Sequence, residues 1–475
     1  MFSVIEATLK RPLKRLTSDH GPAKEYHTPP PGLEKELYRR VVDMGLPSMA
    51  SFLLLNLYEA VNIFWLAKIG ASPVAAVTVF AAFSWVMTFP NHIIGSGSVA
   101  VISRRYGQGG GTPTAEAIRA TFLLKFFTGS FLGIIGVAIL PFALTLYGTE
   151  PDVAKLAFHY GILNSLTFGF AMTSFSVYTA FRGIGRPQAG MWISVAGVAL
   201  NMILDPLLIF GIGPFPRLEI VGASIANSVG FITVVVLGVW MLGRHDSPVP
   251  VKWSFRNLPK SEMKQIWRIG FPSGFSALSF ALMNSTVVGL FAHFGTLVVA
   301  LFGMAQRILR FGHMINVGFG LGTGALVGQY LGAREKENAW HTARISIRLV
   351  MICMFSFVLL IWLFSEPLVK MFFSEPESLE QGKWFLRILV LSLPFRAALE
   401  MMTNAYNGAG RNLPPMIFGI FLDWGLIVLS MLVLGKWLGW GPYGMLAGYA
   451  FGNLLGSAIF FLFFRRGHWL VEEDL

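Results

Sequence analysis

The chain has 475 residues, of which 54% are hydrophobic and only 13% are charged. A soluble protein of this length needs much more charge to cover its surface, so the composition excludes a soluble globular protein. The formal net charge of +12 would suit a nucleic-acid-binding protein. The basic residues are spread over short connections between apolar stretches, however, and this distribution argues against that class.

Apolar stretches of roughly 20 residues, the length that crosses a bilayer, recur along the whole chain. They predict an all-α polytopic membrane protein with twelve transmembrane helices. In chain order, the expected helices are 45–67, 73–103, 119–146, 156–180, 188–212, 221–243, 270–292, 298–330, 345–366, 384–407, 413–436 and 444–464.

The polar segments divide the chain into two lobes of six helices each. We expect a cytoplasmic basic tail at 1–40, a first lobe at 41–243 and a basic cytoplasmic inter-lobe loop at 244–268. The second lobe follows at 269–466, and a cytoplasmic tail at 467–475 ends the chain.

The two halves are similar at one fixed offset in residue number. Gly45-Leu46-Pro47-Ser48 begins the first expected helix, and Gly270-Phe271-Pro272-Ser273 begins the seventh, so the repeat offset is 272 − 47 = 225. Because each half has six helices, we expect the lobes to be related by a pseudo-two-fold axis along the membrane normal. The same repeat offset relates Gly70 to Gly295, Gly107 to Gly332, Gly183 to Gly408 and Gly185 to Gly410.

Basic residues gather on one side of this expected topology. The positive-inside rule places that side in the cytoplasm, together with both ends of the chain, and predicts a multi-pass protein of the inner cell membrane. The basic positions are Lys10, Arg11, Lys14, Arg15, Arg104, Arg105, Arg182, Arg186, Arg244 to Arg268, Arg334, Lys336, Arg411, Arg465 and Arg466.

The first half carries two acidic residues inside expected helices, Glu59 and Asp205. A charged side chain at the bilayer centre costs about 2.5–3.5 kcal/mol, so both are candidates for function. Two carboxylates among neutral oxygen donors can hold Na⁺ or share protons. The amides close to them are Asn56 and Asn62, expected on one broad helical face with Glu59, then Asn201, one turn before Asp205, and Asn227.

Simpler interpretations stay open for these residues. The amides and carboxylates could form hydrogen bonds that hold neighbouring helices together. Asp205 stands beside Pro206 and could instead cap a helix end at the membrane interface.

The second half carries a different set of ionisable residues. Arg396 and Glu400 are four residues apart and can pair on one helical face. Such a pair could hold the lobe together, or a basic lining could receive an anionic group of a substrate. The full set is Arg307, Arg310, Arg396, Glu400 and Asp423.

Several short motifs, in this order and at these spacings, resemble those of one transporter family, the multidrug and toxic compound extrusion (MATE) transporters. The resemblance covers essentially all twelve expected helices. The motifs are Leu46-Pro47-Ser48, Trp65 with Gly70, Arg182-Gly183-Ile184-Gly185, Asn201-Met202-Ile203-Leu204-Asp205-Pro206, Gly328-Gln329-Tyr330-Leu331-Gly332-Ala333 and Asn407-Gly408-Ala409-Gly410.

The resemblance implies a V-shaped fold of two lobes and antiport by alternating access, in which entry of H⁺ or Na⁺ drives the export of small amphipathic organic molecules. It implies no cofactor beyond the coupling ion and no enzymatic activity. The expected partners are small-molecule substrates and the lipid bilayer, without nucleic acid, and the protein is expected to be monomeric.

The first-half motifs are most similar to the DinF-like branch of the family, in which the first helix carries roughly Tyr-Asn-x-x-Asp. Here the segment is Tyr58-Glu59-Ala60-Val61-Asn62, so carboxylate and amide are exchanged. Tyr178 stands where the family has an asparagine, four residues before Arg182. Losing that carbonyl ligand favours H⁺ over Na⁺, although a Na⁺ site near Glu59 and Asp205 stays open.

Two further classes compete with an exporter. One is a flippase of the same superfamily, in which Arg307, Arg310 and Arg396 would grip the phosphate of a lipid or lipid-linked substrate. The other is a membrane enzyme or a channel. No catalytic motif supports an enzyme, and the hydrophilic residues cluster within the lobes rather than along a continuous pore.

Overall fold

The computed structural model describes residues 31–254 and 258–470, and every regular element in these two ranges is a helix. The first half of the chain contains α2 (Pro31–Ala67), α3 (Ala71–Met87), α4 (Phe89–Gly107), α5 (Thr112–Leu146), α6 (Pro151–Leu166), α7 (Phe168–Gly183), α8 (Pro187–Phe210) and α9 (Glu219–Gly243). The second half contains α10 (Lys260–Ala292), α11 (Thr296–Gly332), α12 (Lys336–Leu363), α13 (Ser365–Lys370), α14 (Pro376–Val390), α15 (Leu393–Gly408), α16 (Leu413–Ile420), η1 (Phe421–Val428), α17 (Leu429–Leu432), η2 (Val433–Trp437) and α18 (Gly441–Arg465).

Each expected span corresponds to one helix or to consecutive helices. Within the described ranges, eight helices are long and apolar enough to cross a membrane, or nine if α3 and α4, which are bent by 49° at their junction, form one span. The other three expected spans coincide with α11, with α6 and α7, and with α14 and α15. The prediction of an all-α polytopic membrane protein is therefore confirmed.

Two of the helix breaks occupy equivalent positions in the two halves. Thr167 separates α6 from α7, and Ser392 is the last residue before α15, which reproduces the repeat offset (392 − 167 = 225). At each break a hydroxyl donates back to a carbonyl of the preceding turn: Thr167 Oγ1 to Leu163 O at 2.8 Å and Ser392 Oγ to Leu389 O at 2.7 Å. Such bonds compete with the helix backbone and favour a bend.

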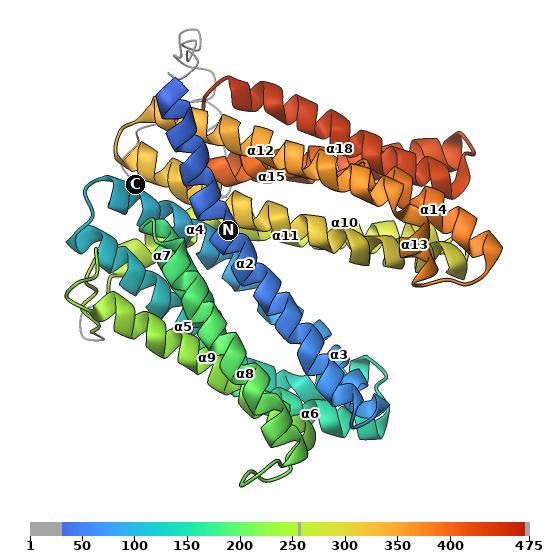
Figure 1. Ribbon diagram of the computed structural model, residues 1–475, viewed down its shortest axis with the longest axis horizontal. Helices are drawn as coiled ribbons and strands as arrows, with labels where there is room; N and C mark the ends of the chain where they lie inside the picture. The colour runs from blue at the N-terminus through green and yellow to red at the C-terminus, as the bar shows by residue number, and fades with distance from the viewer. Residues whose placement is uncertain (1–30, 255–257, 471–475) are drawn as a thin grey trace, which may run out of the picture.

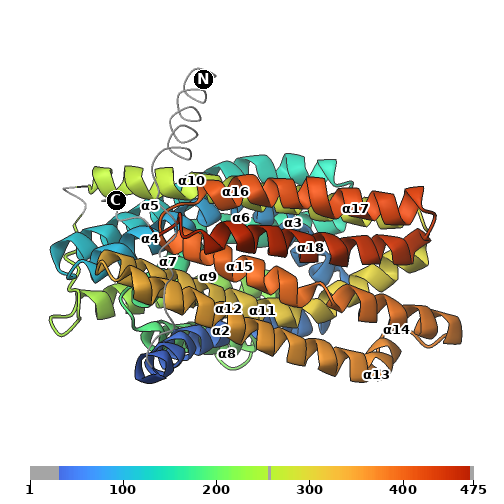
Figure 2. The same cartoon turned by 90° about the horizontal axis from the view of Figure 1, so that it is seen from above.

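The helices form a V with two arms, as the family resemblance implies (Figure 1). The first half of the chain makes the lower arm in this view, and the second half makes the upper arm. The arms meet at one end and diverge towards the other. Seen from above, α16 and α17 lie beside α18, and α12 lies beside α11 (Figure 2).

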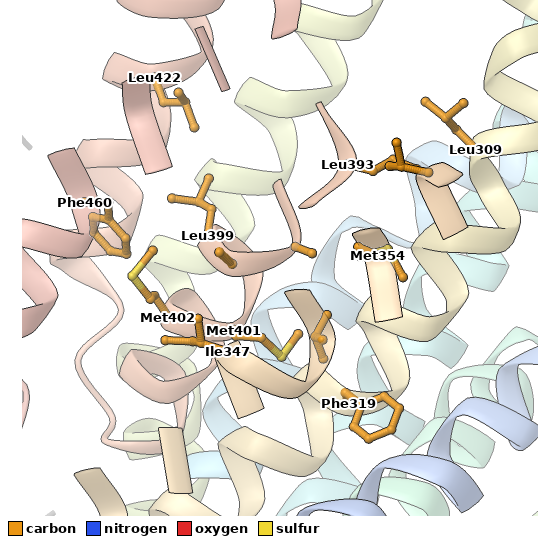
Figure 3. Close-up of a cluster of buried hydrophobic side chains, with 14 of the residues drawn as sticks. Leu309, Phe319, Ile347, Met354, Leu393, Leu399, Met401, Met402, Leu422 and Phe460 are labelled. Carbon is orange, nitrogen blue, oxygen red and sulfur yellow. The ribbon is translucent and has the colours of Figure 1, made fainter. Parts of the chain in front are cut away.

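Each arm has its own hydrophobic core. The core of the first lobe is built mainly from buried residues between Leu66 and Val251, and that of the second lobe mainly from buried residues between Met283 and Leu470. Methionine, leucine and phenylalanine side chains fill the second core, including Met354, Met401 and Phe460 (Figure 3). Burial of apolar area therefore stabilises each lobe separately.

Each lobe also reaches into the core of the other. Val41, in the first turns of α2, is 2% exposed and belongs to the core of the second lobe. Ile266, in the first turns of α10, is fully buried and belongs to the core of the first lobe. These two positions are again related by the repeat offset (266 − 41 = 225). The exchange of helix ends joins the lobes symmetrically at the narrow end of the V.

Glycines permit the matching turns at this end. Gly185, after α7, and Gly410, after α15, have φ angles of 72° and 73°. Residues that carry a side chain rarely adopt this left-handed backbone conformation. Glycine is therefore required for the two turns to have the same shape. The repeat inferred from the sequence is therefore present in the backbone.

Parts of three expected tails and loops are ordered and packed. α2 begins at Pro31, inside the expected tail 1–40, because Leu37 packs in the core of the second lobe. α10 begins at Lys260, inside the expected loop 244–268. Trp469, in the expected tail 467–475, is fully buried against Phe464 at a ring distance of 4.9 Å. Residues 1–30 and 471–475 of the expected tails lie outside the described residues.

Candidate functional site

Asp205 is a fully buried carboxylate in the first lobe. It lies within α8, which continues to Phe210, so the interpretation of Asp205 as a helix cap is wrong. Its Oδ2 accepts a hydrogen bond of 3.2 Å from Asn62 Nδ2 on α2. Its Oδ1 is buried without a hydrogen-bond partner among the described residues. A buried carboxylate with one unsatisfied oxygen is costly as an anion and is therefore suited to taking up a proton.

A chain of hydrogen bonds lies one turn from Asp205. Asn227 Oδ1, on α9, accepts from Tyr58 Oη on α2 and from Asn201 Nδ2 on α8, the latter at 3.5 Å. Asn227 Nδ2 donates to Tyr160 Oη on α6 at 3.2 Å. Asn227 thus connects three other helices through its two amide atoms. The helix-packing role left open for the amides is therefore filled by Asn201 and Asn227.

A narrow crevice in the first lobe adjoins this chain. It runs between α2, α7, α8 and α9, and Tyr178 lies on its wall together with the two amides. The sequence predicted that Tyr178, Asn201 and Asn227 belong to one site, and the fold places them around one crevice. Its lining residues are Leu55, Tyr58, Tyr178, Gly197, Val198, Asn201, Asn227, Gly230, Phe231 and Val234.

Glu59 is exposed, whereas Asp205 is buried. Tyr58 and Asn62 are four residues apart and both face the interior of the first lobe, where they are buried. Glu59 is rotated away from that face and is exposed. The charged group that acts on it is Arg310, on α11 of the second lobe. The expectation that Glu59 and Asn62 share one face is therefore wrong, and the pairing of Glu59 with Asp205 stays a prediction.

The ionisable residues of the second lobe form an ion-pair cluster. Arg396 Nε lies 3.7 Å from Glu400 Oε1, as the four-residue spacing predicted, and Arg396 Nη1 lies 3.9 Å from Asp423 Oδ1. Asp423 Oδ2 also accepts from Ser279 Oγ at 3.1 Å. His313 Nδ1 is 3.5 Å from Glu400 Oε1. The cluster joins α10, α11, α15 and η1, as an internal ion pair would.

Arg307 and Arg310 stand outside this cluster. Both are exposed on α11 and neither forms an ion pair with a described residue. The five second-half residues named by the sequence therefore separate into a bonded cluster and two free guanidinium groups.

The sequence analysis did not name two residues of the first lobe, Tyr160 and Lys125, as site candidates, and it named Tyr58 only as part of the first-helix motif. Tyr160 is an ordinary aromatic of an apolar stretch, and its partners come from distant helices, so no local signal identifies it. Lys125 is different, because it is a charged residue within an expected helix and is 1% exposed. Glu59 and Asp205 were chosen because they are charged residues inside expected membrane helices, and the same criterion applies to Lys125.

The family model MatE matches this chain twice, at residues 47–207 and at residues 272–432. The two matches are related at both ends by the repeat offset (272 − 47 = 225 and 432 − 207 = 225). The chain belongs to the MatE family. The repeat, the V-shaped fold and the family match therefore agree on one architecture, that of a transporter rather than an enzyme.

Curated relatives of this MatE protein are transporters of similar length. A probable multidrug resistance protein NorM of Thermotoga maritima is 26% identical over 91% of this chain and 93% of its own length. A probable multidrug resistance protein YoeA of Bacillus subtilis is 24% identical over 83% of this chain and 88% of its own. A FAD transporter of Shewanella oneidensis is 22% identical over 90% of this chain and 95% of its own.

Solved structures share the fold. A transporter of the MOP superfamily from Pyrococcus furiosus, described as having a binding pocket of reverse polarity, superposes with a TM-score of 0.81 at 22% identity. A MATE-family multidrug resistance transporter in an outward-facing conformation also superposes with a TM-score of 0.81 at 22% identity. Each comparison covers 92% of this chain and 98% of the other.

The two lobes of this MatE protein share a backbone but not their polar chemistry. The repeat places Ser430 at the position of Asp205 and Ala171 at the position of Arg396. The first lobe therefore holds a buried, incompletely bonded acid, whereas the second holds acids that are neutralised by an arginine.

Proposed function

We propose that this protein is a secondary active antiporter, in which entry of H⁺ drives the export of small amphipathic organic molecules by alternating access. The observation that carries the proposal is the buried carboxylate of Asp205 with its unsatisfied Oδ1. An acid in this position can exchange a proton when the first lobe opens to one side of the membrane or the other. The names of the multidrug relatives support the substrate class.

The contacts of Asp205 favour H⁺ over Na⁺. Asn62, oriented as its hydrogen bond requires, presents an amide N–H to the carboxylate. A donor of this kind opposes a metal cation, whose ligands must be oxygen atoms. It does not oppose a proton on Oδ1. The alternative of Na⁺ coupling would need Asn62 to turn and offer its carbonyl oxygen.

Coupling would be tested in proteoliposomes that contain the purified protein. A pH gradient is imposed, and the uptake of the fluorescent dyes rhodamine 123 and fluorescein is followed with and without Na⁺. We expect gradient-driven transport of at least one dye, independent of Na⁺, that Asp205→Asn reduces to the level of empty liposomes.

Asp423→Asn is the matched control, because Asp423 is a buried acid that is already neutralised by Arg396. Dye transport should still depend on the pH gradient in that variant. Transport by Asp205→Asn that follows the pH gradient as in the wild type would exclude Asp205 as the coupling group. A requirement for Na⁺ would replace H⁺ as the coupling ion.

A second candidate function is movement of a lipid or lipid-linked anionic substrate between leaflets. The observation that favours it is the pair of exposed arginines on α11, Arg307 and Arg310, which could hold a phosphate. Its test is the translocation of a fluorescent anionic phospholipid in the same proteoliposomes. Translocation that Arg307→Ala with Arg310→Ala abolishes, while the dyes are not transported, would favour the flippase.

A further inference from the structure

Lys125 is a buried ammonium group without a counter-ion. It lies on α5 with 1% of its surface exposed. No described residue forms a hydrogen bond or an ion pair with it. The charged groups that act on it are Arg182 on α7 and His92 on α4, and both are basic. Its surroundings are therefore electropositive.

An isolated ammonium in an apolar interior is strongly unfavourable unless an anion neutralises it or it gives up its proton, and a bound anion keeps the lysine charged. One favourable contact is present, because Lys125 Nζ lies 5.9 Å from the centre of the Phe175 ring on α7. A cation–π contact offsets only a small part of the cost of losing water. The two acids of the first-lobe helices named by the sequence do not supply the rest, because Asp205 bonds to Asn62 and Glu59 is exposed.

Gly95 on α4 leaves open space beside this ammonium. A Cβ atom on Gly95 would have a single heavy atom within 4 Å, and that atom is Lys125 Nζ at 4.0 Å. Val99, one turn along the same face of α4, packs in the core of the second lobe. Gly95 therefore faces the second lobe, and the absence of a side chain there leaves Lys125 reachable from that direction.

Aromatic groups adjoin the same position. The Phe175 ring lies beside the ammonium, and Tyr178 packs edge-on against Phe175 with ring centres 6.2 Å apart. His92, three residues before Gly95 on α4, is exposed. A ligand that entered at Gly95 would thus meet a lysine, an imidazole and aromatic rings. This combination suits an aromatic molecule that carries a carboxylate, sulfonate or phosphate group.

We propose that Lys125, reached through the gap at Gly95, binds the anionic group of the exported molecule, so that the substrate class of this transporter is amphipathic aromatic anions. The inference rests on the proposed export function, because it assigns the substrate of that transport. Lys125 holds the anionic group, and the aromatic rings contact the apolar part. The counter-ion that Lys125 lacks is then supplied by the substrate.

Binding to the full-length protein in lipid nanodiscs tests the inference without requiring transport. Fluorescein and rhodamine 123 share a tricyclic ring system and carry opposite charges, so their fluorescence anisotropy compares the two charge classes. Empty nanodiscs correct for partition into lipid. We expect the wild type to bind fluorescein, and Lys125→Met to weaken that binding roughly tenfold or more. Lys125→Arg, which keeps the charge, should retain it.

Gly95→Leu is the second variant, because it keeps the lysine and covers it. It should weaken fluorescein binding as Lys125→Met does, and thermal unfolding of both variants shows whether they are folded. Fluorescein binding that is unchanged in both variants would overturn the proposal. So would a wild type that binds rhodamine 123 but not fluorescein, or neither dye. If gradient-driven transport fails while the fluorescein results hold, the proposed export is wrong and the anion site stands.

Discussion

Gly107 and Gly332 occupy the same position in the two halves of the chain and pack against each other where the lobes meet. A Cβ atom on Gly332 would lie 3.0 Å from the Cα atom of Gly107. Equivalent positions can touch only on the axis that relates them, so the pseudo-two-fold axis passes between α4 and α11 at this point. No side chain fits here, and glycine is needed on both sides.

The contact defines which end of the transporter is closed. Next to it, Gln329 Nε2 donates to Gly183 O at 2.9 Å, and further along α4 Asn412 Nδ2 donates to Ser96 Oγ at 2.7 Å. Both bonds join residues of opposite lobes. Alternating access requires such contacts to break when the V opens at this end. The closed end can therefore be fixed by a covalent link between the lobes.

The first prediction concerns such a link. Ser96 Oγ on α4 and Ser273 Oγ on α10 are 2.8 Å apart, a separation compatible with a disulfide between cysteines at these positions. In a Cys353→Ser background, oxidation of the Ser96→Cys, Ser273→Cys protein should abolish dye transport, and dithiothreitol should restore it. The reason is that the linked helices belong to opposite lobes and must separate when the closed end opens.

A pair within one lobe provides the control. Ser98 Oγ and Thr121 Oγ1 are 2.9 Å apart, but α4 and α5 belong to the same lobe. Oxidation of the Ser98→Cys, Thr121→Cys protein should leave transport intact. If the link between Ser96 and Ser273 positions forms and transport continues, the lobes do not separate at this end.

The second prediction concerns the charges that face each other across the lobes. Glu59 and Arg310 are exposed, and the guanidinium acts electrostatically on the carboxylate. Closing the wide end of the V brings opposite charges together and is favoured by their attraction. Glu59→Arg should slow dye transport several-fold, because two cations then oppose closure. Adding Arg310→Glu restores the attraction and should recover most of the rate.

Proteoliposome transport at low and high salt measures this effect. The loss in Glu59→Arg should shrink as salt rises, because exposed charges are screened. Failure of the double variant to recover would mean that Glu59 has a role that needs a carboxylate at that position. Glu59 would then regain the coupling role that the sequence suggested.

The fold could be predicted from the sequence because its signals are local and repeated. Apolar length located the spans, and the matching segments at Pro47 and Pro272 revealed the repeat. The breaks at Thr167 and Ser392 could not be anticipated from apolar length, because the hydrophobic pattern continues through them. The sequence also could not predict that Val41 packs in the core of the second lobe and Ile266 in the core of the first. An apolar residue looks the same in the sequence whichever lobe buries it.

The candidate site was predictable only in part. Asp205, Asn201 and Asn227 were identified because polar groups inside a membrane helix are costly. The placing of Glu59 and Asn62 on one face was wrong, because spacing along α2 does not decide which side of a broad face is buried in its own lobe. The charged group that acts on Glu59 across the V is Arg310, which lies in the other half of the chain.

The third prediction concerns the ion-pair cluster of the second lobe. Arg396 neutralises Asp423, which is 4% exposed, and Glu400, and its guanidinium also lies 4.4 Å from the centre of the Phe280 ring. Arg396→Met leaves two acids without a counter-ion and should lower the stability of the second lobe by about 3 kcal/mol. Thermal unfolding in detergent should show a lower midpoint.

Adding Asp423→Asn to Arg396→Met should return much of the lost stability. The amide keeps the hydrogen bond from Ser279 and removes the unpaired charge. If Arg396→Met unfolds at the wild-type temperature, the cluster does not hold the lobe together. The arginine would then be available to a substrate, as the flippase hypothesis requires.

The fourth prediction concerns Asn227, which connects α2, α6 and α8 to α9. Asn227→Leu removes both amide atoms and leaves the hydroxyl groups of Tyr58 and Tyr160 without this partner. Each buried polar group left unpaired costs about 1–3 kcal/mol, so the unfolding midpoint should fall clearly. Asn227→Leu combined with Tyr58→Phe and Tyr160→Phe removes the stranded hydroxyls and should unfold at a higher temperature than Asn227→Leu alone. If the triple variant is no more stable than Asn227→Leu, these hydrogen bonds contribute little and packing holds the crevice open.

If the triple variant is more stable than Asn227→Leu but transports no dye, Asn227 is needed for transport as well as for stability.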